Sequence, residues 1–133
     1  MKPIRKVDLR KVPKSEDDVW AGWVFRMILL TLKYNVHKIS WKTHLKDSRT
    51  KKGLEGTVDM AGNIELDLRN RNNPEAVSIL IHEIAHRAMR FMPEEMILLF
   101  EAIAWETLTD AQKNYLRRFL PRKIPKKTKK PRK

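Results

Sequence analysis

The stretch from Pro74 to Arg90 reads PEAVSILIHEIAHRAMR, and it decides most of what the sequence predicts. Asn73 directly before it is a residue type that caps helices, and Pro74 and Glu75 suit a first helical turn. The apolar residues recur at helical spacing, and they are Val77, Leu80, Ile81, Ile84 and Ala88. We therefore expect a helix that packs one face against a core.

Within this stretch His82, Glu83 and His86 form the pattern H-E-x-x-H. Positions i and i+4 lie on one helix face about one turn apart, so both imidazoles can reach one metal ion with Glu83 beside them as a base. The alternative is that they are ordinary core or surface histidines. Two histidines and a glutamate in the most apolar part of a helix are costly to bury without a purpose, which favours a metal site. The pattern thus indicates a zinc-dependent hydrolase.

The composition limits the kind of site and the number of domains. A chain of 133 residues has room for one small domain. It has no cysteine, so any metal must be held by histidine and carboxylate. The longest apolar stretch, residues 19–32, is too short to span a bilayer and contains Arg26. The charged N-terminal residues do not resemble a secretory signal. We expect a cytoplasmic protein with no membrane partner.

The net charge of +13 is concentrated at the two ends of the chain. Residues 1–14 carry six Lys or Arg and one Asp, and residues 121–133 carry eight Lys or Arg and no acid. The 106 residues between them are neutral overall. We expect a basic N-terminal arm (1–14), a folded domain (15–120) and a disordered basic tail (121–133). Nucleic acid or another polyanion is a candidate partner of these tails, and a merely solubilising role is the alternative.

The rest of the chain predicts an α+β fold. Ser15 and the acids after it begin a helix that runs to about Tyr34, with Trp20 and Trp23 expected in the core. Residues 37–46 alternate like a half-buried strand, and residues 57–60 and 64–68 read as a hairpin around residues 61–63. Two further helices begin near Pro93 and at Thr109. The expected sheet is short, antiparallel or mixed, with about three strands packed on the first helix and the motif helix.

A strand at residues 64–68 that directly precedes an H-E-x-x-H helix resembles the zincin metallopeptidases, and residues 78–86 (SILIHEIAH) closely resemble their active-site helix. The likeness covers roughly residues 36–108. It implies a small zincin-like domain, bound zinc, a protein or peptide substrate, and a role for strand 64–68 as an edge that pairs with extended substrate. The strand-then-motif order is also similar to SprT-like and ImmA/IrrE-like proteases, without the cysteine zinc ribbon that often follows in the first group.

The third metal ligand distinguishes the zincin branches. Metzincins continue as H-E-x-x-H-x-x-G-x-x-H, whereas here RAMRF follows His86 and no later histidine exists. The gluzincin branch, with a glutamate from a following helix, remains. Its candidates are Glu94, Glu95, Glu101 and Glu106.

Among these four we expect Glu101 to be the ligand. It is the only charge in residues 96–105, where an unpaired carboxylate would be costly to bury. Glu101-Ala102-Ile103 also resembles the glutamate-containing gluzincin helix. Glu94 and Glu95 lie near the turn and read as first-turn acids, and Glu106 suits a supporting or surface role.

The expected reaction is peptide-bond hydrolysis, with Glu83 as general base for a zinc-activated water. Tyr115, His37 and His44 are open candidates for stabilising the oxyanion. One alternative is a nucleic-acid-binding protein with a structural or degenerate metal site, and an intact Glu83 argues against it. Another is a protease delivered to nucleic acid by its tails. A third is a small interaction protein with an accidental motif.

Overall fold

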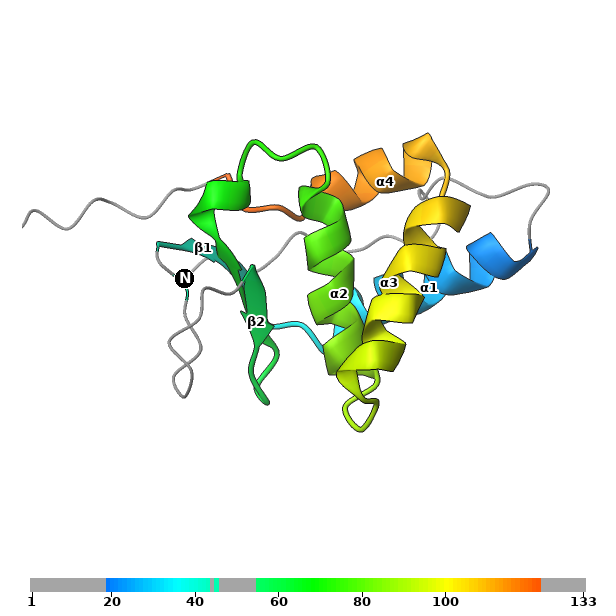
Figure 1. The fold of residues 1–133 in the computed structure, drawn as a ribbon, viewed down its shortest axis with the longest axis horizontal. Coiled ribbons are helices and arrows are strands. Elements are labelled where there is room, and N and C mark those ends of the chain that lie inside the picture. Colours follow the sequence, from blue (N-terminus) through cyan, green and yellow to red (C-terminus); the bar gives the residue numbers. More distant parts are fainter. Residues whose placement is uncertain (1–18, 44, 46–54, 123–133) are drawn as a thin grey trace, which may run out of the picture.

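The computed structural model describes residues 19–43, 45 and 55–122 (Figure 1). The expected cap at Ser15, the N-terminal arm, His44 and all but the first two residues of the basic tail lie outside these ranges. The helices are α1 (Val19–Tyr34), α2 (Ala76–Ala88), α3 (Glu94–Thr107) and α4 (Asp110–Arg117), and a short 3-10 turn, η1, spans Leu68–Asn70. The strands are β1 (Lys38–Lys42), β2 (Gly56–Val58) and β3 (Asn63–Asp67).

The three strands form one mixed sheet in the order β1-β3-β2. β1 runs parallel to β3, and β2 runs antiparallel to it. The expected α+β fold with a short mixed sheet is confirmed. The expectation that strand 64–68 is an edge is wrong, because β1 and β2 take both sides of β3. The edge on the α2 side of the sheet is β2 (Figure 1).

Helix α2 is the centre of the molecule. It packs on α1, α3, α4 and two strands, and α3 runs back along it after a short turn (Figure 1). The expected apolar stripe is buried as far as Ile84, while Ala88, the last residue of the helix, is exposed. The Asn73 side chain accepts the Glu75 N–H at 2.9 Å, so it ends the loop just before α2. The core therefore fixes the direction in which the polar face of α2 points.

The hairpin of β2 and β3 follows the expected pattern around residues 61–63. Gly62 has φ of +87°, a conformation that side chains with Cβ rarely adopt. A Cβ there would lie 2.2 Å from the Asn35 carbonyl oxygen, so the turn also needs glycine for space. Asp59 accepts the N–H groups of Ala61 and Asn63 and so closes the turn. These bonds fix the turn that joins β2 to β3.

Trp23 and helix α3 are more exposed than their sequence indicated. Trp23 is 53% exposed. In α3 only Ile97 and Ala104 are buried, although the helix is mostly apolar. Its burial is limited because one face rests on α2 and α1 and the remainder faces solvent. Among the described residues, no helix is both long and apolar enough to cross a bilayer.

A hydrogen bond joins the start of the basic tail to the sheet. The indole N–H of Trp41 donates to the carbonyl oxygen of Pro121 at 2.7 Å. Trp41 is buried in the core cluster, and Phe119 packs in the same cluster. The folded unit therefore includes Pro121, one residue beyond the expected boundary.

Candidate metal centre

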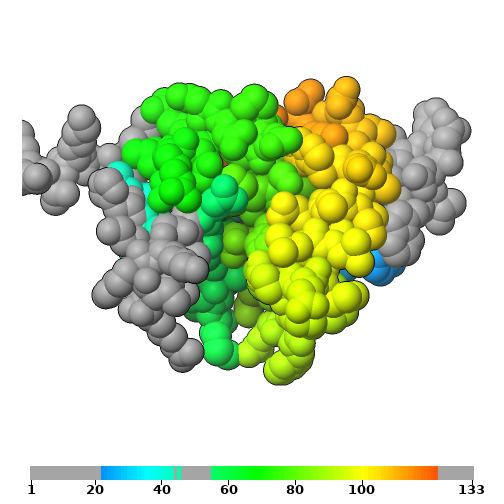
Figure 2. Space-filling model, in the orientation of Figure 1, coloured from blue at the N-terminus to red at the C-terminus, as the bar shows by residue number. Residues whose placement is uncertain are grey.

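A cleft of about 780 Å³ lies along the polar face of α2. Residues 55–60 of the hairpin form one wall, and Glu94, Leu98 and Glu101 of α3 form the other. Figure 2 shows the hollow between these two walls. His82, Glu83 and His86 lie on its floor. The motif is thus presented to an accessible groove between the sheet and α3.

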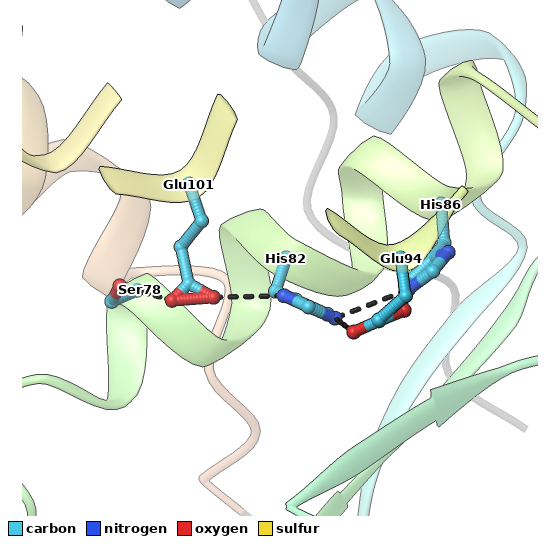
Figure 3. A network of polar contacts seen from close by, with 5 residues as sticks. All are labelled: Ser78, His82, His86, Glu94 and Glu101. Atoms are coloured by element: carbon cyan, nitrogen blue, oxygen red, sulfur yellow. Dashed lines mark hydrogen bonds and ion pairs between the residues drawn. The ribbon is translucent and has the colours of Figure 1, made fainter. Parts of the chain in front are cut away.

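Three side chains converge in this cleft. Nε2 of His82 lies 2.8 Å from Oε1 of Glu94, Nε2 of His86 lies 2.7 Å from Oε2, and the two Nε2 atoms are 3.1 Å apart (Figure 3). Each of the three residues offers one ligand atom, and these three atoms lie within 4.8 Å of one another. They could hold a metal ion.

The donor set fits zinc in number and in chemistry. Two imidazoles and one carboxylate are the protein ligands of many catalytic zinc sites, which keep a fourth position open. Bond lengths of about 2.0–2.1 Å imply ligand atoms roughly 3.3 Å apart in a tetrahedron. The observed separations are a few tenths of an ångström shorter, an adjustment that side-chain rotation can make.

Glu101 lies behind His82 rather than beside the three converging groups. Its Oε1 is 2.8 Å from Nδ1 of His82, and its Oε2 accepts the Ser78 hydroxyl at 3.2 Å (Figure 3). This hydrogen bond raises the pKa of His82, while burial acts in the opposite direction. In the neutral ring, an Nδ1–H donated to Glu101 leaves the Nε2 lone pair directed at Glu94 and His86.

The structure therefore assigns different positions to the glutamates than the sequence predicted. Glu94, not Glu101, joins the histidines, because the turn of residues 89–93 brings the first turn of α3 close to the end of α2. Glu101 lies seven residues further along α3, level with His82 and Ser78. The short turn of residues 89–93 is the sequence signal that could have indicated how α3 aligns with α2. Glu95 and Glu106 are exposed and do not line the cleft.

Glu83 is the most buried acid of the cleft, with 6% of its surface exposed. Burial raises its pKa to about 7, and the neighbouring His82 partly offsets this effect. A cation held by the histidines would lower the pKa of Glu83 again, because opposite charge favours the ionised carboxylate. A carboxylate that titrates near neutral pH suits a general base.

Gly56 of β2 makes the space that Glu83 occupies. A Cβ at Gly56 would lie 3.0 Å from Cγ and 3.2 Å from Oε2 of Glu83, and 3.1 Å from Leu66. These contacts are tighter than ordinary van der Waals distances. Strand β2 thus sets the position of the Glu83 carboxylate from across the cleft.

We expect Gly56→Ala to displace Glu83 and to reduce turnover by about tenfold, since small misplacement of reacting groups is costly. Zinc content should be unchanged, and overpacking should lower the free energy of unfolding by about 1 kcal/mol. Kinetic assays and thermal unfolding measure both effects. Gly22→Ala in α1 is the control, because its Cβ would meet nothing within 4 Å. Equal activity of the two variants would contradict this positioning.

The two oxyanion candidates that the structure describes, Tyr115 and His37, do not line the cleft. Tyr115 packs edge-on against Phe25 and Phe119, with ring centroids 6.1 and 5.8 Å away. His37 is exposed before β1 and does not line the cleft, and His44 lies outside the described residues. The cationic residues that do line it are Arg87 and Arg90.

Comparison of the chain with protein-family models, with curated proteins and with solved structures gave no match.

Proposed function

We propose that this chain is a zinc-dependent metallopeptidase of the zincin type, with a gluzincin-like ligand set. The observation that carries the proposal is the convergence of His82, His86 and Glu94 in an open cleft beside the buried Glu83. A structural metal site has no need of an accessible groove or of a buried carboxylate next to its ligands. Both features favour hydrolysis.

His82, His86 and Glu94 would hold the zinc, and Glu101 would keep His82 oriented. When bound, zinc supplies Lewis-acid chemistry and lowers the pKa of water. Glu83 then accepts the proton of the attacking water and passes it to the leaving nitrogen. The Glu83 side chain is buried against Gly56, and this contact holds its carboxylate on the cleft floor.

The hairpin wall suggests how a polypeptide would lie in the cleft. In the described part of the chain β2 pairs with β3 alone, and residues 55–60 all line the cleft. An extended peptide can add to such a strand through main-chain hydrogen bonds. We propose that protein or peptide substrates bind along β2, in place of the pairing with strand 64–68 that the zincin likeness implied.

Metal content and proteolysis test this proposal. Purified protein is expected to bind one equivalent of zinc and to cleave an unfolded generic substrate, with cleavage lost in chelator and restored by added zinc. Mass spectrometry of the products distinguishes hydrolysis from adventitious degradation. Stoichiometric zinc without cleavage would refute the peptidase and leave a metal-binding domain.

A second candidate is delivery of this domain to nucleic acid. The observation that favours it is the charge distribution, because all of the excess +13 lies in residues 1–14 and 121–133. Polycationic tails bind polyanions by releasing counterions, without reading sequence.

Deletion of residues 123–133 tests this role and keeps Pro121, which Trp41 needs as an acceptor. The truncation removes seven positive charges, so DNA affinity should fall and its dependence on salt should flatten. Zinc content and thermal stability should stay the same. Equal DNA binding by both forms at low salt would contradict the candidate.

A further inference from the structure

Two arginines line one end of the cleft without a carboxylate partner among the described residues. Nε of Arg87 donates to the carbonyl oxygen of Asn35 at 2.8 Å, and Arg90 lies 3.9 Å from the sulfur of Met60. Neither forms an ion pair within the described part of the chain. The cleft, which five acids line, thus also holds two cations that have no carboxylate partner among the described residues.

The Arg90 side chain reaches the tip of the hairpin. Its guanidinium lies 5.9 Å from the ring centroid of Phe91 and contacts Met60 at the tip of the hairpin. The nearest acid of the hairpin tip, Asp59, already accepts from Ala61 and Asn63. The guanidinium therefore contacts Phe91 and Met60 and no acid of the hairpin tip, and its charge remains available to a ligand.

Both cations share the cleft with the three converging groups. Arg87 directly follows His86 in the last turn of α2, and Arg90 lies in the turn after the helix, which ends at Ala88. A peptide in the cleft that reaches the metal centre can therefore also reach the two guanidinium groups.

We infer that Arg87 and Arg90 form a subsite for a substrate carboxylate near the cleaved bond. The inference rests on the proposed peptidase function and names its substrate class, which is a polypeptide with an acidic group on one side of the scissile bond. Guanidinium groups match carboxylates in geometry and in charge. The carboxylate belongs either to an Asp or Glu side chain or to the C-terminus of the substrate.

Peptide binding to zinc-loaded Glu83→Gln tests the subsite without relying on turnover. One fluorescent peptide is varied with Asp, Ala or Lys at three positions on each side of the bond that the wild type cleaves, with its C-terminus amidated. A second set carries a free C-terminal carboxylate. Fluorescence anisotropy measures each dissociation constant.

We expect Asp at one position, or the free C-terminus, to tighten binding about tenfold relative to Lys or the amide. Arg90→Glu should reverse that preference. Arg71→Glu makes the same charge change outside the cleft and should leave it intact. The peptide set whose dissociation constant changes shows whether the carboxylate comes from a side chain or from the C-terminus.

Two results would overturn the inference in distinguishable ways. Peptides that bind and are cleaved with no preference for acid at any position would refute the subsite and leave the peptidase standing. Absence of both binding and cleavage for every peptide would refute the peptidase, and the subsite with it.

Discussion

Glu83→Gln should bind one equivalent of zinc and lose peptide hydrolysis by roughly 10³-fold, the middle of the range for loss of a general base. Glutamine keeps the size of the side chain and fits the space beside Gly56, but it cannot accept the proton of the attacking water. Zinc should be retained because Glu83 is not among the three converging groups. Loss of zinc in this variant would make Glu83 a ligand and refute its assignment as base.

The same variant reports on the burial of Glu83 through the pH dependence of stability. In chelator-treated wild type, the raised pKa means that the folded state resists ionisation of this carboxyl. The resulting cost is absent below pH 4.5, the ordinary value, grows as the pH rises, and is complete above about 7. It amounts to roughly 3 kcal/mol.

Glutamine is neutral throughout this range. The difference in unfolding free energy between Glu83→Gln and wild type, measured in chelator by denaturant titration, should therefore shift in favour of the variant between pH 5 and pH 8. A difference that does not change with pH would show that Glu83 is solvated in the folded protein.

Glu94→Ala should weaken zinc binding by more than about 100-fold, because it removes one of three ligands. Glu101→Ala should weaken it less, by about 10–100-fold, the usual effect of losing a group that orients a ligating histidine. Competition titration with a chromogenic chelator measures both affinities.

Glu95→Ala is the matched control for Glu94. It removes an acid from the same first turn of α3 and so has a similar effect on the helix dipole, but it does not line the cleft. We expect near-normal zinc affinity. A larger loss for Glu101→Ala than for Glu94→Ala would restore Glu101 as the third ligand.

The sequence predicted the helices of the domain because their signals are local. The apolar stripe on α2 as far as Ile84, the start of a helix at Thr109 and the turn at Gly62 all depend on neighbouring residues, and the structure contains each of them. The H-E-x-x-H spacing likewise places both histidines on one helix face without knowledge of the fold.

The features that the sequence did not predict depend on packing between distant segments. The place of Glu94 beside both histidines, and of Glu101 at Nδ1 of His82, depends on the register of α3 against α2, and that register is set by the turn between them. The burial argument for Glu101 assumed an enclosed helix, whereas most of α3 faces solvent. The edge position of β2 and the contact between Gly56 and Glu83 arise only when the sheet packs on α2.

Anomalous scattering at the zinc absorption edge, recorded from crystals grown with one equivalent of zinc, tests the metal centre most directly. The predicted result is a single strong peak about 2.0–2.2 Å from Nε2 of His82, Nε2 of His86 and a carboxylate oxygen of Glu94, with Glu101 still bonded to Nδ1 of His82. A peak coordinated by Glu101, or no peak within the cleft, would contradict the account.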